Sequence, residues 1–200
     1  MEIKSKIDNY IGFDSDEMFK ACDLILIFGG ALRDIISNQQ IQDVDILVGS
    51  KSIKNLQSVL IRNGYKYMED FVSKDVSNIY EINVICEPHT WMNGDRIIQI
   101  IRPSGNNDSQ ETYIKNLLDL VKNVDISCCG LSYNGISLKE DYPNALLHCY
   151  NKVFSVNKSA KMYSSKRISN RIDKLQKRGW ELIENTIQNN RDLKIKMLVE

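Results

Sequence analysis

The sequence has no long apolar stretch and few of the residues that build metal or disulfide frameworks. No apolar run of eighteen residues occurs among its 200 residues, so no membrane span is expected. The N-terminus has no apolar signal region, and we expect a cytoplasmic protein. The five cysteines include no C-x-x-C pair, which argues against a structural zinc site. Neither histidine, His89 or His148, stands in a pattern typical of a Ser-His-Asp or Cys-His group.

The net charge is zero, but the charges are unevenly distributed. Asn151 to Arg178 contains nine Lys or Arg and a single acid, Asp173, which gives this segment +8 and the remainder −8. We therefore predict an acidic core over residues 1–140. A basic, helical C-terminal appendage over residues 141–200 is expected to pack on it, and its charge favours an anionic partner.

Short apolar runs alternate with helical patterns along the chain. Strands are expected at residues 24–28, 44–48, 65–71, 78–86, 96–102 and 125–133. Helices are expected from residue 14, over 31–37, over 52–62, from 108 to about 121, over 143–150 and from about 167 to 179. This mixed order predicts an α/β or α+β fold, with a mixed sheet flanked by helices.

A double glycine, Gly29-Gly30, stands between an expected strand and an expected helix. Glycine permits a positive φ and lets backbone N–H groups come close to an anion. The helix that follows directs its positive end to the same place, which suits phosphate. No Gly-Lys-Ser/Thr follows, so the segment is not a Walker loop.

Two carboxylates, Asp43 and Asp45, come thirteen residues or more after the glycines. Residues i and i+2 of a strand project from the same face, so these side chains stand roughly 6–7 Å apart at the backbone. Their mutual repulsion is relieved by a divalent cation, and Mg²⁺ takes carboxylates together with substrate phosphates. Each motif is common alone; the two joined by one short helix are far more specific.

Together these motifs resemble the head-domain signature of the polymerase-β-type nucleotidyltransferase superfamily. The segments are Phe28-Gly29-Gly30-Ala31-Leu32-Arg33-Asp34 and Asp43-Val44-Asp45-Ile46-Leu47, and the CCA-adding enzyme and bacterial poly(A) polymerase branch is the most similar. The resemblance implies that Gly29 and Gly30 hold the triphosphate of an NTP, with Arg33 near it. It also implies that Asp43 and Asp45 hold catalytic Mg²⁺ or Mn²⁺.

The superfamily usually adds a third carboxylate from a neighbouring strand. Asp125, at the start of an apolar run, is the preferred candidate, and Glu81 is the alternative. An acid inside an apolar strand is costly unless it is paired or bound to metal. The Arg-Arg-Asp-Phe-Thr-Ile-Asn-Ala-Leu and Glu-Asp-x-x-Arg stretches of CCA-adding enzymes are absent, so a minimal catalytic head with a helical appendage is expected.

The basic appendage is the second candidate contact surface. Arg171, Lys174 and Arg178 fall near one helical stripe and are expected to meet the phosphates of a nucleotide or of an acceptor RNA. Trp180 either stacks on a base or packs in the core, and Tyr163 is a second stacking candidate.

The leading hypothesis is transfer of a nucleoside monophosphate from an NTP, ATP above all, to an acceptor hydroxyl. RNA is the favoured acceptor, reached through residues 151–178. Two alternatives remain: a non-catalytic nucleotide- or partner-binding module with the same fold, and an enzyme that attaches nucleotides to a protein.

Overall fold

The described chain builds one seven-stranded sheet and a separate pair of short strands. The computed structural model describes residues 3–69, 85–104, 118–157 and 165–183. The strand order is β3-β4-β5-β2-β1-β6-β7. Within this sheet only β2 and β5 run parallel. The strands are β1 (Ile25–Phe28), β2 (Val44–Val48), β3 (Lys66–Tyr67), β4 (Ile85–Asn93), β5 (Arg96–Ser104), β6 (Leu131–Tyr133) and β7 (Leu138–Glu140).

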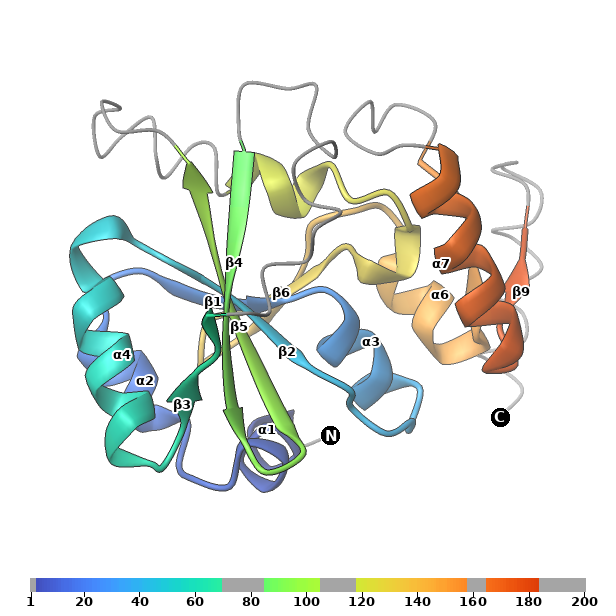
Figure 1. Ribbon diagram of the computed structural model, residues 1–200. Helices are drawn as coiled ribbons and strands as arrows, with labels where there is room; N and C mark the ends of the chain where they lie inside the picture. Colours follow the sequence, from blue (N-terminus) through green and yellow to red (C-terminus); the bar gives the residue numbers. More distant parts are fainter. Residues whose placement is uncertain (1–2, 70–84, 105–117, 158–164, 184–200) are drawn as a thin grey trace.

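Helices gather at both ends of this sheet (Figure 1). Helices α2 and α4 lie side by side at one end, and α6 and α7 lie at the other. The helices are α1 (Ile3–Ile11), α2 (Asp16–Ala21), α3 (Gly30–Ile36), α4 (Ile53–Arg62), α6 (Ala145–Asn151) and α7 (Ser165–Lys177). Two 3-10 turns, η1 (Ser50–Ser52) and η4 (Ser127–Cys129), and a helical stretch at 118–122 complete the set.

The central strand β2 separates two hydrophobic clusters because its side chains alternate. Val44, Ile46 and Val48 are buried in the main core, together with residues of α1, α3 and α4. Leu47 lies on the opposite face of β2, in a small cluster with Leu120 and Val121 of the helical stretch at 118–122. Burying each such side chain stabilises the fold by about 1.5–3 kcal/mol. Asp45 shares the face of Leu47, so the core on the opposite face fixes where its carboxylate points.

The expected fold class is confirmed, with differences at several elements. Strand β4 continues to Asn93, beyond the strand expected over 78–86, because β5 pairs with it along its whole length. The strand expected over 125–133 is wrong in its first half: η4 interrupts it and only Leu131–Tyr133 is strand. Residues 78–84 and the start of the helix expected from 108 lie outside the described residues.

The C-terminal elements join the main core. Leu175 of α7 and Trp180, which follows α7, are buried in the same cluster as Ile7 and Leu32. Strand β8 (Val153–Phe154) pairs in parallel with β9 (Glu181–Leu182) on either side of α7 in sequence. None of the helices in the described ranges is both long and apolar enough to cross a membrane.

Candidate active site

Asp43 and Asp45 stand at the beginning of β2, in the middle of the sheet. Asp43 immediately precedes the strand, and Asp45 pairs with Phe28 of β1 and with Gln99 of β5. Tyr10 of α1 holds the chain segment that leads into β2. Its hydroxyl donates to the Gln42 carbonyl at 2.6 Å and accepts from the backbone N–H of Ile97 at 3.1 Å. Both carboxylates are partly buried.

The glycine loop lies next to Asp45. Gly29 follows β1 and has a φ of 75°, a conformation that favours glycine, and its carbonyl accepts from the N–H of Arg33. A Cβ on Gly29 would stand 3.7 Å from Oδ2 of Asp45. The Gly29 N–H donates to the carbonyl of Leu131 at 3.1 Å, so this amide is already engaged in the sheet. Gly29 therefore shapes the loop and lets it approach the acid closely.

The electrostatic surroundings of Asp45 join three parts of the chain. Burial and the charge of Asp43 raise the pKa of the Asp45 carboxyl to about 7, while Arg171 and Arg167 of α7 act in the opposite direction. Two carboxylates that repel each other in this way destabilise the folded protein, and such pairs are common in active sites. The C-terminal helix thus contributes positive charge to the same centre as the two acids.

Arg33 lies beneath the glycine loop. A Cβ on Gly30 would stand 3.4 Å from its Nη2 atom. The guanidinium is buried, pairs with Asp34 at 2.7 Å and lies 5.8 Å from the centre of the Trp180 ring. Asp34 also accepts from Arg178 at 3.1 Å, so one buried carboxylate joins α3 to the end of α7. The contact of Arg33 with a triphosphate stays a prediction.

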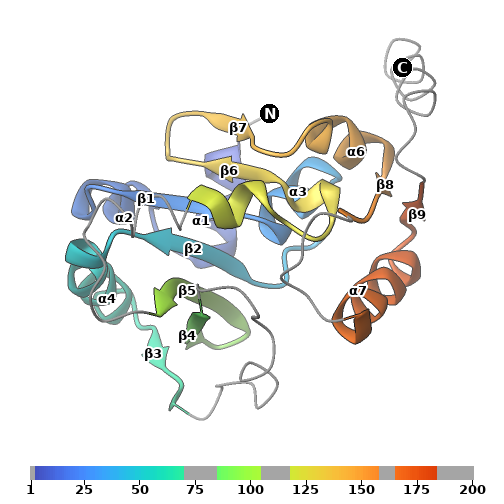
Figure 2. The same cartoon turned by 90° about the horizontal axis from the view of Figure 1, so that it is seen from above.

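Trp180 packs in the core, which is one of the two positions weighed for it. It is buried, and its indole N–H donates to the side chain of Gln39 at 2.9 Å. This contact and the Arg178–Gln40 hydrogen bond fasten α7 to the loop that leads into β2. Viewed from above, α7 lies beside that loop (Figure 2). Tyr163 lies outside the described residues.

Asp125 is buried and paired with a cation. Its Oδ1 accepts from Nη1 of Arg171 at 2.7 Å, and its Oδ2 has no partner among the described residues. A second nitrogen of Arg171 lies 3.7 Å from the Sγ of Cys129. Asp125 therefore holds Arg171 in place beside the acid pair. Glu81, the alternative third acid, lies outside the described residues.

Cys129 lies between two guanidinium groups. Its Sγ accepts from Nη1 of Arg33 at 3.4 Å and from Arg171 on the other side. A hydrogen bond from Cys128 and the charges of Arg33 and Arg171 lower the pKa of the Cys129 thiol. Burial raises the pKa of the Cys128 thiol instead. Deprotonation of Cys129 is therefore favoured, and it would offset part of the positive charge of Arg33 and Arg171 behind the glycine loop.

The acid pair fits a divalent cation that also binds substrate. Within the ranges that the structure describes, no three Cys, His, Asp or Glu side chains form a metal-binding group. Mg²⁺ is commonly bound by one or two carboxylates, with water and substrate phosphates filling the other positions. Two carboxylates that repel each other are a donor set of this kind.

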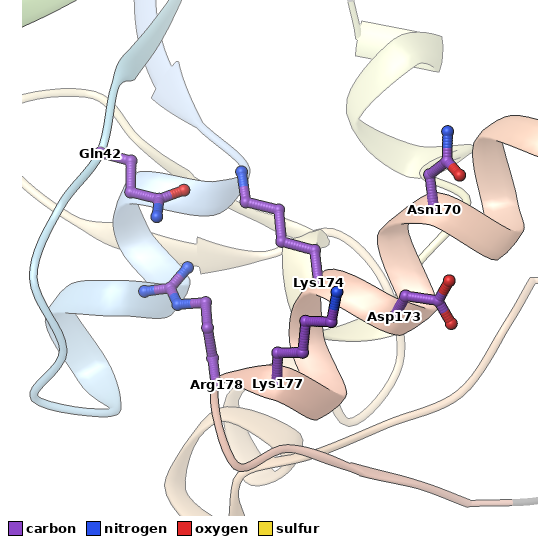
Figure 3. Close-up of a pocket in the computed structure, with 6 residues that line it drawn as sticks. All are labelled: Gln42, Asn170, Asp173, Lys174, Lys177 and Arg178. Atoms are coloured by element: carbon purple, nitrogen blue, oxygen red, sulfur yellow. The ribbon is translucent and has the colours of Figure 1, made fainter.

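The structure separates the three basic residues of the predicted stripe. Arg171 faces Asp125 and Cys129, whereas Lys174 and Arg178 line a pocket with Gln42 (Figure 3). Sequence reasoning did not select Arg167, Cys129 or Gln42. Arg167 stands one helical turn before Arg171, and this spacing could have predicted that both lie on the same face of the helix. Cys129 is brought to the site only by the tertiary fold.

Comparison with solved structures places this fold among known ones. A CCA-adding enzyme in an apo form matches with a TM-score of 0.59 and 17% identity, over 96% of this chain and 42% of that one. A tRNA-processing enzyme with CTP matches with a TM-score of 0.53 and 16% identity, over 84% and 42%. The Thermotoga maritima CCA-adding enzyme complexed with tRNA matches with a TM-score of 0.52 and 15% identity, over 85% and 37%.

These matches show the fold. The chain shares its fold with a part of these CCA-adding and tRNA-processing enzymes. It spans about two fifths of the length of the structures it matches. No family model and no curated protein matches the sequence.

Proposed function

We propose that the protein transfers a nucleoside monophosphate from an NTP to an acceptor hydroxyl and releases pyrophosphate. The observation that carries this proposal is the close approach of the Gly29 loop to Asp45, beside Asp43 and within the influence of Arg171. Acids for a metal, a glycine loop that comes close to them and a cation held in place are parts that phosphoryl transfer uses. The fold is shared with proteins solved with CTP and with tRNA, which supports an NTP substrate and an RNA acceptor.

In this proposal each residue has a defined task. Asp43 and Asp45 hold Mg²⁺ or Mn²⁺, which when bound neutralises triphosphate charge and activates the attacking hydroxyl. The loop of Gly29 and Gly30 receives the triphosphate, with Arg33 beneath it. Arg171 faces the reacting phosphates and is positioned by Asp125. Asp125 positions Arg171 through Oδ1, and its Oδ2, which has no partner among the described residues, keeps Asp125 as the proposed third acid of the metal site.

The transfer itself needs little from the protein beyond positioning. The acceptor oxygen forms a bond to the α-phosphorus, and the bond between that phosphorus and the bridging oxygen of pyrophosphate breaks. The hydroxyl proton leaves to solvent, and pyrophosphate carries away the bonding electron pair. ATP is the first NTP to test, because the branch of the superfamily that the motifs resemble includes bacterial poly(A) polymerases.

The proposal is tested by incubating the full chain with each α-labelled NTP, Mg²⁺ or Mn²⁺, and either total RNA or a cell lysate. The matched control is the double variant Asp43→Asn/Asp45→Asn, which keeps side-chain size and removes both charges. Label transferred by the native chain and not by the control supports the proposal, and the labelled species identifies the acceptor. A labelled protein band would instead favour the protein-modifying alternative.

Absence of transfer with every NTP, metal and acceptor would count against catalysis. If NTP nevertheless raised the melting temperature of the native chain, the binding-module alternative would explain the site better. The Asp43→Asn/Asp45→Asn variant is expected to fold, because removing the repulsion between the two acids favours the folded state.

A further inference from the structure

A polar pocket lies between the loop before β2 and the outer half of α7. It has a volume of about 440 Å³, large enough for a nucleotide-sized group. Figure 3 shows the Gln42 amide, the Lys174 ammonium and the Arg178 guanidinium directed towards one another, with the Asp173 carboxylate turned away from them. The lining residues are Gln42, Asn170, Asp173, Lys174, Lys177 and Arg178.

The pocket carries positive charge that the described part of the protein does not neutralise. Lys174 and Lys177 are exposed and form no ion pair with any described residue. Arg178 is held at one end, because its Nη2 contacts Asp34 at 3.1 Å and the Gln40 carbonyl at 3.3 Å. Its Nη1 is covered and has no partner among the described residues, so a small rotation towards the pocket would satisfy it with an anionic oxygen.

The chemistry of the lining indicates a phosphate backbone. All six residues are polar, so no apolar or aromatic wall is present to hold a base or an apolar peptide side chain. Lysine and arginine contacts to phosphate oxygens carry no base information. A nucleic-acid strand bound here would therefore be recognised by its charge and not by its sequence.

The pocket adjoins the acid pair, because Gln42 immediately precedes Asp43 in the chain. Along α7, Lys177 lies about 9 Å beyond Arg171 at 1.5 Å per residue. Arg167 and Arg171 act on Asp45, whereas Lys174, Lys177 and Arg178 line the pocket.

We infer that this pocket binds backbone phosphates near the 3′ end of a single-stranded nucleic-acid acceptor and directs its terminal hydroxyl to Asp43 and Asp45. The inference rests on the proposed function and specifies its acceptor. It assigns Lys174 and Arg178 to the acceptor strand instead of the NTP, and it adds Lys177 and Gln42 to the site.

The test is binding of fluorescent single-stranded oligo(A) and oligo(U) RNA to the full chain, measured by anisotropy without NTP or metal. The test variant is Lys174→Ala/Lys177→Ala, and the matched control is Lys166→Ala, which removes an exposed lysine of the same helix outside the pocket. Each lost phosphate contact lowers the salt dependence of log K by about 0.7 for a single strand. The double variant should therefore bind about tenfold more weakly or worse, equally for both RNAs, with a salt slope smaller by about 1.4.

Several results would overturn the inference. Unchanged RNA binding by the double variant would show that the pocket does not bind the acceptor. An equal loss of affinity in the Lys166→Ala control would show that RNA binds to the exposed basic surface of the helix and not to the pocket. A loss for only one RNA would contradict backbone recognition. Binding of polyglutamate that depends on Lys174 and Lys177, with no RNA binding, would assign the pocket to an acidic protein.

The two proposals fail in distinguishable ways. RNA binding needs no NTP, so it can persist in a protein that transfers nothing, which would contradict only the proposed function. Conversely, transfer by the native chain together with unchanged RNA binding by the double variant would contradict only the pocket. Equal melting temperatures of the native and variant chains would show that the exposed lysines do not alter the fold.

Discussion

Asp45→Asn is expected to stabilise the metal-free protein at neutral and higher pH. Burial and the charge of Asp43 raise the pKa of Asp45 to about 7 from the ordinary value of 3.8. The folded state therefore binds this proton more tightly than the unfolded chain does. As the pH rises from about 4 to about 7, the unfolded chain releases the proton first, and the native protein loses stability. Asparagine carries no charge and does not show this loss.

The magnitude follows from the two pKa values. Each pKa unit corresponds to about 1.4 kcal/mol, so the difference amounts to about 4 kcal/mol at pH 8. The carboxyl is only partly shielded from water, which reduces the expected gain in unfolding free energy to about 2–4 kcal/mol. At pH 5, where Asp45 is largely protonated in the folded state, the gain should fall to about 1 kcal/mol.

The assay is urea denaturation of the native and Asp45→Asn proteins in the presence of a metal chelator at several pH values between 5 and 8. Asp23→Asn, at an exposed carboxylate, serves as the control and should change stability by less than about 0.5 kcal/mol. A native protein more stable than Asp45→Asn at pH 8 would refute the reasoning. So would a difference between the two that does not grow from pH 5 to pH 8.

Three further substitutions test the surroundings of the site. Asp34→Ala leaves the buried Arg33 without its carboxylate and should lower the unfolding free energy by about 3–5 kcal/mol in urea; a loss below about 1 kcal/mol would contradict the role of this pair. Gly29→Ala, at φ of 75°, should cost about 1–2 kcal/mol in the same assay, and no cost would mean that the loop does not need this conformation. Cys129→Ala should abolish a thiolate whose ultraviolet absorbance titrates below the ordinary cysteine pKa; its persistence would assign that thiolate to another cysteine.

Local patterns made the central motif predictable from the sequence. The run before Gly29 is apolar because it forms a central strand, and the positive φ of Gly29 matches the expected need for glycine there. The strand expected over 44–48 is confirmed, and its alternation places Asp45 on the face opposite the main core. These features depend on neighbours within a few residues, which sequence periodicity can report.

Long-range contacts were not predictable in the same way. The run after Asp125 has the apolar composition of a strand, but η4 forms there and buries Asp125 against Arg171, 46 residues later in the chain. The position of Cys129 between Arg33 and Arg171 likewise follows from the meeting of α3, η4 and α7 in the fold, which no local pattern encodes. The pocket at Gln42 also depends on long-range contacts, because its other lining residues belong to α7 and the residue after it, far from Gln42 in the sequence.

The central claim is that the acid pair beside the glycine loop transfers the α-phosphate of an NTP. It is tested most directly by supplying ATP labelled at either the α- or the γ-phosphate, with Mg²⁺ and single-stranded RNA, to the native chain and to Asp43→Asn/Asp45→Asn. The account predicts that only α-label enters RNA, only with the native chain, and that a chelator stops it. Incorporation of γ-label, or α-label incorporated equally by the variant without its two acids, would contradict it.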